Sequence, residues 1–298
     1  MVEQFKEISP QLIENESMSR HTTFKIGGNA DMFVSITSVS ELASLIELAK
    51  EKNVPYTVIG NGSNLLVGDK GIRGLVIEIG QGLAGYEVRG NVIYAQAGIL
   101  LKKLASVAAA ESLSGLEEVS GVPGTLGGGV FMNAGAYGGE LKDTVKKVTY
   151  IDCDGELYTI DTSECNFGYR KSVFSEGGKF IVSAELELKK GDKEEILNKM
   201  ADYTKRRREK QPISYPSAGS TFKRPEGYFA GTMIEQAGLK GYRCGDAMVS
   251  ELHAGFVINC GKATAQDVIA VIEHTKKTVL EKFGVKLEPE VRFLGEFE

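Results

Sequence analysis

The spacing of hydrophobic and polar residues predicts four helices, at residues 40–53, 100–112, 191–211 and 266–283. Ser40 is a candidate N-cap for the first helix, and Gly284 follows the last one as a stop signal. The stripes expected to face the core are Ile196, Leu197, Met200 and Tyr203 in the third helix, and Val268, Ile269, Ile272, Val279 and Phe283 in the fourth. The third helix is strongly charged, which is typical of a helix that links two domains.

Short runs of alternating apolar residues predict strands between these helices. Such runs occupy residues 56–60, 74–80 and 180–190, and a closing strand is expected within residues 285–295. Gly90-Asn91 and Asp154-Gly155 each separate two alternating runs, so two-residue hairpin turns are predicted there. Because strands and helices alternate irregularly, the pattern favours an α+β fold over a regular array of parallel strands.

We place a domain boundary at residue 190. The first domain covers residues 1–190, with lobes of about 1–70 and 71–190, and the second covers residues 191–298. A cleft between two domains is the usual place for a ligand.

Composition changes this picture mainly through glycine and charge. Glycine accounts for 36 of 298 residues, well above the usual ~7%, which indicates tight bends and close backbone approaches. The net charge of -5 argues against a nucleic-acid-binding protein. The four cysteines form no C-x-x-C pair and the three histidines have no metal spacing, so neither zinc nor disulfides are expected. The N-terminus carries no apolar signal segment and no membrane span is predicted, so we expect a cytoplasmic protein.

Two glycine-rich segments are candidate anion sites: Gly60-Asn61-Gly62-Ser63-Asn64 and residues 121–129. Glycines allow consecutive backbone N–H groups to converge on a phosphate without obstruction. Neither segment is a P-loop, and the first lacks the third glycine of the dinucleotide fingerprint. The alternative is that these glycines serve tight turns and close packing. The polar side chains of Ser63, Asn64 and Asn133 favour a ligand, although such residues are also common in turns.

Five motifs in order make the chain similar to a known family. They are IGNGSNLLV (59–67), SGVPGTLGGGVFMNAGAYG (120–138), FGYRKSVF (167–174), SAGSTFKRP (217–225) and EPEVRF (288–293). Together they resemble the UDP-N-acetylenolpyruvoylglucosamine reductase family of flavoenzymes. The resemblance implies a vanillyl-alcohol-oxidase (PCMH) type FAD-binding domain and a C-terminal substrate domain. It further implies that NADPH reduces UDP-N-acetylglucosamine enolpyruvate to UDP-N-acetylmuramate, a precursor of the cell wall.

The resemblance also assigns residues. Arg170 would stabilise the enolate, Ser220 would donate the proton, and Glu290 would orient the charge network. Tyr169 and Lys223 would contact substrate. The residues expected at FAD are Gly60, Asn61, Gly62, Ser63, Asn64, Gly121, Pro123, Gly124, Thr125, Gly127, Gly128, Asn133, Ala134 and Gly135. No metal is assigned, and a monomer or weak dimer is expected.

Each assignment has a plainer alternative. Arg170 could be a surface arginine, Ser220 a turn residue, and Glu290 a partner of Arg292. The basic run 205–210 is expected to be a solvated helix end, with attraction of a substrate phosphate as the alternative. Arg224 stands where many family members have asparagine, and the C-terminal region resembles a compact subgroup without a tyrosine loop. Two other functions stay open: a flavin oxidase of the same fold, and a non-catalytic nucleotide-binding module.

Overall fold

The chain forms two compact units, each assembled from separated stretches of sequence. The computed structural model describes residues 1–297. The first unit comprises Met1–Glu14, Met32–Asn61 and Gly74–Arg206, and the second comprises Asn15–Asp31, Gly62–Arg73 and the described residues from Arg207 onward. Two N-terminal stretches therefore belong to the same unit as the C-terminal residues. The expected functional boundary at residue 190 stays a prediction.

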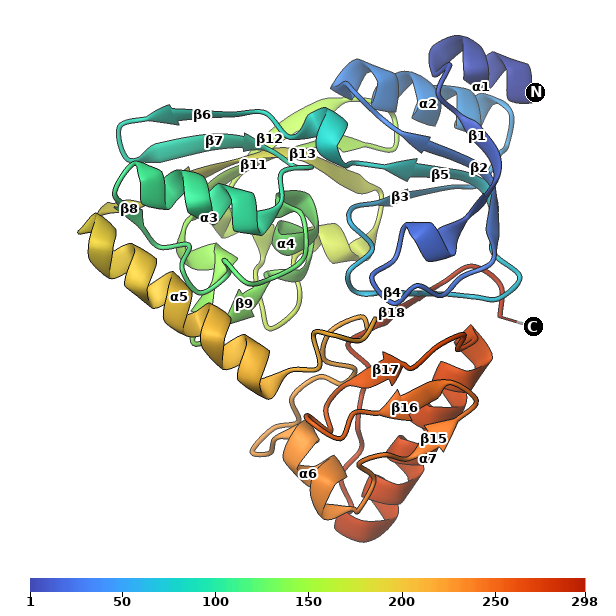
Figure 1. Cartoon of the computed structure of the whole chain (residues 1–298). Coiled ribbons are helices and arrows are strands. Elements are labelled where there is room, and N and C mark those ends of the chain that lie inside the picture. The colour runs from blue at the N-terminus through green and yellow to red at the C-terminus, as the bar shows by residue number, and fades with distance from the viewer. Residues whose placement is uncertain (298) are drawn as a thin grey trace. The chain divides into compact units, whose positions relative to one another are not determined.

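A four-stranded sheet lies mainly in the first unit. Its order is β1 (Ile13–Ser17), β2 (Asn29–Ser35), β5 (Ile72–Glu78) and β3 (Tyr56–Ile59), and β3 runs parallel to β5. Helices α1 (Val2–Ile8) and α2 (Val39–Glu51) lie side by side beside this sheet (Figure 1). The N-cap of α2 is Ser38 and not Ser40, because the Ser38 hydroxyl accepts the amide hydrogen of Glu41 at 3.1 Å.

An antiparallel sheet of five strands completes the framework of the first unit. Its order is β12 (Leu157–Asp161), β11 (Val145–Asp152), β13 (Lys179–Glu187), β7 (Val92–Gln96) and β6 (Tyr86–Arg89). The hairpin at Gly90-Asn91 is confirmed, with Gly90 at φ +67°. The hairpin between β11 and β12 also forms, but its turn is longer than the predicted two residues. The Asp152 carboxylate accepts the amides of Asp154 and Glu156 and so stabilises a wider loop.

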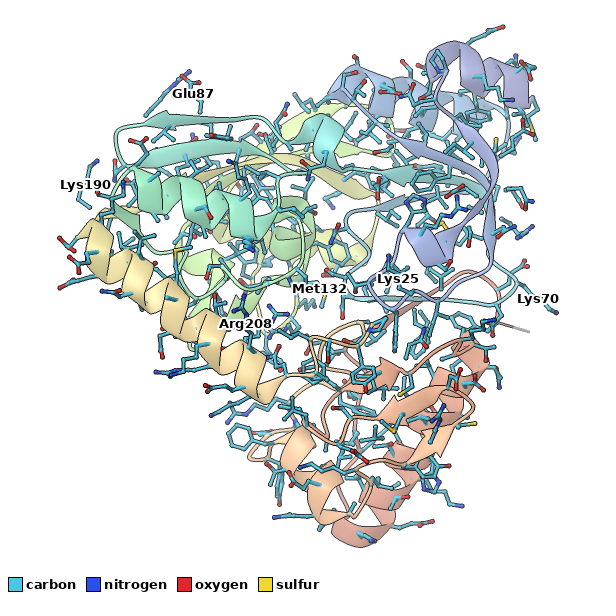
Figure 2. All side chains as sticks on the ribbon, in the orientation of Figure 1. Lys25, Lys70, Glu87, Met132, Lys190 and Arg208 are labelled. Carbon is cyan, nitrogen blue, oxygen red and sulfur yellow. The ribbon has the colours of Figure 1, made fainter. Side chains whose placement is uncertain are left out.

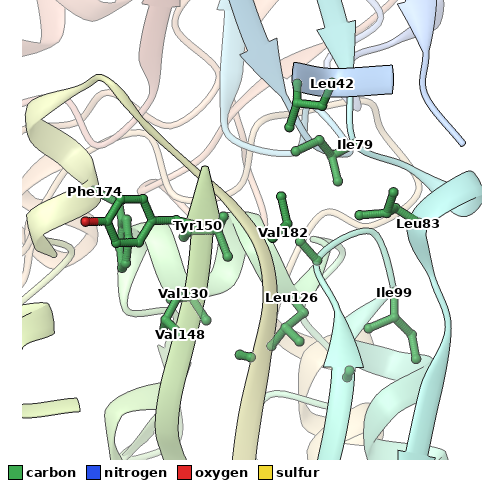
Figure 3. Close-up of a cluster of buried hydrophobic side chains, with 14 of the residues drawn as sticks. Leu42, Ile79, Leu83, Ile99, Leu126, Val130, Val148, Tyr150, Phe174 and Val182 are labelled. Atoms are coloured by element: carbon green, nitrogen blue, oxygen red, sulfur yellow. The ribbon is translucent and has the colours of Figure 1, made fainter. Parts of the chain in front are cut away.

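Helices α3 (Leu101–Ala110) and α4 (Leu126–Met132) cover one face of this sheet (Figure 1). Leu126 and Val130 of α4 point toward Val148 and Val182 of the strands, and all four side chains are buried (Figure 3). Burying one such side chain contributes about 1.5–3 kcal/mol. This packing fixes the position of the segment that precedes α4. In contrast, Glu87 and Lys190 project from the periphery of the unit into solvent (Figure 2).

Helix α5 (Lys193–Lys210) is the predicted charged helix, but its apolar stripe is narrower than expected. Ile196 is buried and Met200 packs against the core, whereas Leu197 is 48% exposed. The smaller elements of the first unit are β8 (Leu113–Ser114), β9 (Gly135–Ala136), β10 (Gly139–Glu140), β14 (Lys189–Lys190), η2 (Gln81–Leu83), η3 (Leu141–Asp143), η4 (Thr162–Cys165) and η5 (Val173–Glu176). The strand expected at residues 180–190 is thus divided into β13 and β14, and β14 pairs with β8.

The second unit is built around helix α7 (Ala265–Phe283), whose N-cap is Thr264 and whose C-cap is the left-handed Gly284. Phe283 departs from the predicted buried stripe because it is 39% exposed. The unit also contains η1 (Met18–Arg20), α6 (Ala230–Gln236) and the antiparallel sheet β15 (Arg243–Cys244), β16 (Ala247–Val249) and β17 (Val257–Asn259). The expected closing strand is short: β18 (Arg292–Leu294) pairs in parallel with β4 (Leu65–Val67).

The described elements confirm the α+β class. None of the helices within residues 1–297 combines the length and the apolar character needed to cross a membrane.

Candidate active site

Two glycine-rich loops of the first unit are joined directly. Gly60 follows β3, and Thr125 is the N-cap of α4. The side-chain amide of Asn61 donates a hydrogen bond to the carbonyl oxygen of Pro123 at 2.6 Å. A Cβ atom on Gly60 would lie 2.7 Å from the Thr125 hydroxyl oxygen, so a larger residue there would displace the N-cap side chain of α4. The two segments that the sequence singled out therefore form one structure.

These joined loops present backbone N–H groups that lack a protein acceptor. Across residues 1–297, the amides of Gly60, Asn61, Gly124 and Thr125 donate no hydrogen bond to another protein atom. Gly124 and Thr125 are buried, and Thr125 is only 3% exposed. A buried amide without an acceptor is rare and costs free energy. The loops therefore fit an anionic group such as a pyrophosphate, whose oxygens would accept from these amides.

Other glycines of the two segments serve the packing of the protein itself. A Cβ atom on Gly127 would lie 2.8 Å from the Cβ of Ala97, and one on Gly135 would lie 2.5 Å from the Gly139 carbonyl oxygen. In the second unit, a Cβ atom on Gly62 would lie 2.0 Å from the His21 carbonyl oxygen. Gly128 differs, since its Cβ would meet only the Thr125 hydroxyl at 3.5 Å, an ordinary contact. The packing alternative thus explains several glycines but not Gly128.

Asn133 connects three segments of the first unit. It ends α4 in the left-handed conformation and is fully buried. Its side-chain N–H groups donate to the Glu140 carboxylate and the Gly168 carbonyl oxygen, each at 3.0 Å, and its Oδ1 accepts the amide of Lys142 at 3.0 Å. Both side-chain N–H groups of Asn133 are used within the protein, so the side chain joins these segments of the first unit. Ala134 and Gly135 follow it, whereas Gly121 lies in the turn before Pro123.

Arg170 lies in a strained turn of the first unit. Its φ is +53°, an uncommon value for a residue with a side chain. The turn is closed by a bridge between Gly168 and Lys171, and an Arg170 guanidinium N–H donates to the Gly135 carbonyl oxygen at 3.0 Å. The guanidinium also lies over the ring of the half-exposed Tyr169, at 5.2 Å from its centroid. Strain of this kind is often found at functional sites.

The segments that carry Ser220 and Glu290 pair in the second unit although the two residues are 70 positions apart. Ser220 is exposed, and the next residue, Thr221, is buried. The Thr221 amide donates to the Gly255 carbonyl oxygen at 2.8 Å, and its carbonyl oxygen accepts the Glu290 amide at 2.8 Å. Phe222 and Pro289 extend this pairing as an isolated bridge. The backbone thus sets the segment that carries the glutamate beside the segment that carries the serine.

Asn64 and Lys223 support the same pairing. The side-chain amide of Asn64 donates to the Glu290 carbonyl oxygen at 3.0 Å, and the Asn64 carbonyl oxygen accepts the Arg292 amide at 2.9 Å. The Lys223 ammonium lies 3.3 Å from the Glu288 carboxylate. Asn64 therefore holds the glutamate segment, and Lys223 pairs with an acidic residue beside it. Ser63 lies half-buried in the loop before Asn64.

Comparisons with known proteins identify two family domains along the chain. Residues 30–161 match the family described as FAD binding domain, and residues 211–294 match the C-terminal domain of UDP-N-acetylenolpyruvoylglucosamine reductase. The protein of that name from Agathobacter rectalis is 53% identical over 298 residues, which covers 96% of this chain and 95% of the relative. The chain belongs to the UDP-N-acetylenolpyruvoylglucosamine reductase family.

Other members of the reductase family support this placement. The relative of the same name from Caldanaerobacter subterraneus subsp. tengcongensis is 49% identical and covers 99% of this chain and 98% of its own length. The crystal structure of the family member from Thermus caldophilus superposes with a TM-score of 0.82 at 37% identity, covering 95% of this chain and 98% of that chain. The resemblance and the flavin-binding fold expected from the sequence are confirmed.

The structure adds His253 to the residues that surround the reductase motifs. Its Nδ1 accepts the Gly255 amide at 3.1 Å, and Gly255 in turn accepts the Thr221 amide. Burial lowers the pKa of His253 below its ordinary value, which favours the neutral ring that this bond requires. The sequence did not assign His253 because a single histidine between Leu252 and Ala254 carries no spacing signal. In the described part of the chain, no three His, Cys, Asp or Glu side chains are grouped closely enough to hold a metal ion.

Proposed function

We propose that this chain is an FAD-dependent reductase that converts UDP-N-acetylglucosamine enolpyruvate to UDP-N-acetylmuramate with NADPH as the reductant. The product is a peptidoglycan precursor, so the proposed role is in cell-wall synthesis, cell shape and cell division, and the proposed location is the cytoplasm. We propose a monomer or weak dimer that acts without nucleic acid or membrane. Family membership supports the reaction, and the joined glycine loops support the cofactor.

The first unit would hold the cofactor through its main chain. The amides of Gly60, Asn61, Gly124 and Thr125 would donate to the pyrophosphate oxygens of FAD. Gly62, Ser63 and Asn64 continue the first loop, and Gly121, Pro123, Gly127 and Gly128 belong to the second. When bound, FAD supplies the hydride chemistry, which no amino-acid side chain can provide.

Arg170 would bind the carboxylate of the enolpyruvyl group. Addition of hydride to the alkene moves negative charge into that carboxylate as an enolate, and a planar guanidinium can hold both oxygens. A charge fixed in place before the reaction stabilises the transition state without reorganisation. The half-exposed Tyr169, stacked under Arg170, would line the same subsite.

Ser220 would donate the proton to the carbon that does not receive hydride. A serine hydroxyl is a weak acid, so the resulting alkoxide needs stabilisation from its surroundings. Glu290 would orient the substrate and the charge network, and Lys223 would contact the substrate near the serine. The observation that carries this assignment is the backbone pairing of Glu290 with Thr221, which sets the glutamate segment beside Ser220.

The test is an anaerobic titration of the purified protein followed by absorbance. We expect a bound flavin spectrum, bleaching on addition of NADPH, and return of the oxidised spectrum when the enolpyruvyl sugar nucleotide is added. Return of the oxidised spectrum with oxygen but not with the enolpyruvyl sugar nucleotide would support the oxidase alternative. A protein that binds no flavin and oxidises no NADPH would contradict the proposal.

A further inference from the structure

The turn of the hairpin formed by β9 and β10 begins with a tyrosine in a left-handed conformation. Ala136 pairs with Gly139, so Tyr137 and Gly138 form a two-residue turn, with φ of +52° and +97°. The first position of such a turn normally holds glycine, asparagine or aspartate, because a side chain at positive φ is strained. A large aromatic residue at this position must therefore be held by contacts elsewhere.

Those contacts come from helix α5. The ring of Tyr137 stacks on the ring of Tyr203, with centroids 4.3 Å apart and planes 6° from parallel. The Tyr137 hydroxyl donates to the Tyr203 carbonyl oxygen at 3.2 Å. Tyr203 is itself anchored, since its hydroxyl donates to the Glu118 carboxylate at 3.4 Å and Lys199 pairs with the same carboxylate at 2.7 Å. The tip of the hairpin is thus fastened to the surface of α5.

The base of the same hairpin binds the side chain of Arg170. The Gly135 carbonyl oxygen accepts a guanidinium N–H of Arg170 at 3.0 Å. Gly135 is only two residues from Tyr137, and its backbone pairs with Glu140 across the hairpin. A change in the position of the tip therefore moves the carbonyl that holds the arginine.

We propose that Tyr137 is a positioning residue that acts through Arg170. Its stack on Tyr203 fixes the β9–β10 hairpin and thereby sets the orientation in which Arg170 meets the substrate carboxylate. The inference rests on the role proposed for Arg170. A purely structural role for the tyrosine pair would instead affect stability without a selective effect on the step that uses the carboxylate.

Two variants remove the stack from opposite sides. Tyr137→Gly keeps a residue that tolerates positive φ, so the hairpin turn can still form, and Tyr203→Leu leaves the hairpin sequence unchanged. For both, we expect reoxidation of the reduced flavin by the enolpyruvyl sugar nucleotide to slow about 10-fold, because small misplacements of a catalytic group are costly. Flavin reduction by NADPH should stay within about two-fold of the wild type. Tyr158→Leu is the matched control, since it removes another half-exposed stacked tyrosine, on β12, and should leave both steps unchanged.

A double-mutant cycle identifies the route of the effect. Once Arg170→Lys has removed the guanidinium fork, Tyr137→Gly should cause no further slowing of reoxidation, because the two changes remove one interaction. Equal slowing in the wild-type and Arg170→Lys backgrounds would overturn the proposal. It would also fail if reoxidation in both stack variants remained within two-fold of the wild type.

Hydrogen–deuterium exchange supplies a readout that does not depend on turnover. In the holoenzyme, amides of residues 135–141 should exchange faster in Tyr137→Gly and Tyr203→Leu than in the wild type or Tyr158→Leu. Unchanged exchange would show that the stack does not fix the hairpin, and the inference would be rejected even if the reductase function holds. If exchange is faster in both stack variants but the wild-type protein does not reduce the enolpyruvyl substrate, the proposed function is rejected. The conclusion that the tyrosine stack fixes the hairpin is then retained.

Discussion

Asn61 and Asn64 lie three positions apart in one loop, but their side chains serve different units. Asn61 belongs to the first unit and binds the Pro123 carbonyl oxygen, which joins the two glycine-rich loops. Asn64 belongs to the second unit and binds the Glu290 carbonyl oxygen, which supports the glutamate segment. The two asparagines therefore represent two ways of building a site.

In the first unit the candidate cofactor site is made of main chain. Its amides belong to loops that β3 and α4 position, and its glycines are required by close contacts such as that of Gly127 with Ala97. In the second unit the candidate groups are side chains on coil segments, held by a few backbone bonds around Thr221. We therefore expect the first unit to be sensitive to added atoms and the second to lost functional groups.

Arg170 belongs to the first unit, but its proposed role depends on its side chain. Its replacement should have the largest effect. Arg170→Lys keeps the positive charge but loses the planar fork, so substrate-dependent flavin reoxidation should slow by about 10²–10³-fold, as for loss of an oxyanion donor. Flavin content and reduction by NADPH should be unchanged. Arg89→Lys, at an exposed site on β6, is the control. Rapid reoxidation in Arg170→Lys would remove the arginine from the chemistry.

Two adjacent glycines of α4 separate packing from ligand binding. Gly127→Ala should destabilise the protein by about 1–3 kcal/mol, because the added methyl group overlaps Ala97. Gly128→Ala meets no such obstacle and gains up to about 1 kcal/mol of helix propensity, so the apoprotein should be at least as stable as the wild type. If FAD lies against Gly128, however, this variant should bind flavin more weakly. Thermal melts with and without FAD measure both effects. Wild-type flavin affinity in Gly128→Ala would contradict the proposal that the joined glycine loops hold FAD.

Replacing Asn61 or Asn64 should have the next largest effect. Each change removes one side-chain hydrogen bond, which usually contributes about 1 kcal/mol. Asn61→Ala should weaken FAD binding several-fold and leave reoxidation of the bound flavin unchanged. Asn64→Ala should slow reoxidation several-fold and retain full flavin content. Flavin titration and single-turnover kinetics on both variants check the pattern. Identical defects in the two variants would break the comparison between the units.

Acid stability gives the smallest predicted difference. Burial lowers the pKa of His253 in the second unit, so below its ordinary value of 6.5 the unfolded chain takes up a proton first and stability falls. For Glu41 in the first unit, burial raises the pKa, but hydrogen bonds from Ser9, Thr37 and Gln11 together lower it below 4.5. The stability that Glu41 contributes is therefore complete above 4.5 and is lost at lower pH. Acidification should weaken the second unit before the first.

Melting temperatures between pH 7 and pH 3 test this order. His253→Asn can still accept the Gly255 amide but does not titrate, so it should reduce the loss of stability that begins near pH 6.5. Glu41→Gln should affect only the more acidic range. Loss of stability that begins in the range of Glu41 and is insensitive to His253→Asn would contradict the assignment.

Local sequence patterns predicted the elements that depend on local interactions. Helix α7 has a long apolar repeat, a capping threonine and a terminal glycine, and the hairpin at Gly90 has the expected turn. Local pattern was less informative where a side chain competes with the backbone. Asp152 widened a turn that Asp154-Gly155 predicted as tight, and Leu197 on α5 is solvent-exposed although it continues an apolar stripe.

Interactions between distant segments explain what the sequence did not reveal. The second unit includes residues 15–31 because Thr23 donates to the Ser217 carbonyl oxygen, and it includes residues 62–73 because the Asp69 carboxylate accepts the amides of Ala265 and Gln266. No local spacing encodes such contacts. The glycine motifs located the candidate site, but only the neighbours in space show which glycine is needed for packing and which has room for an added methyl group.

The central claim is that main-chain groups hold the cofactor, whereas side chains act on the substrate. It is tested most directly by measuring the two half-reactions of Ser220→Ala under anaerobic stopped-flow conditions. The account predicts that NADPH reduces the bound flavin at the wild-type rate, within about two-fold, and that reoxidation by the enolpyruvyl sugar nucleotide slows about 10²-fold or more, as expected on loss of a general acid. Equal slowing of both steps, or normal reoxidation without the hydroxyl, would contradict it.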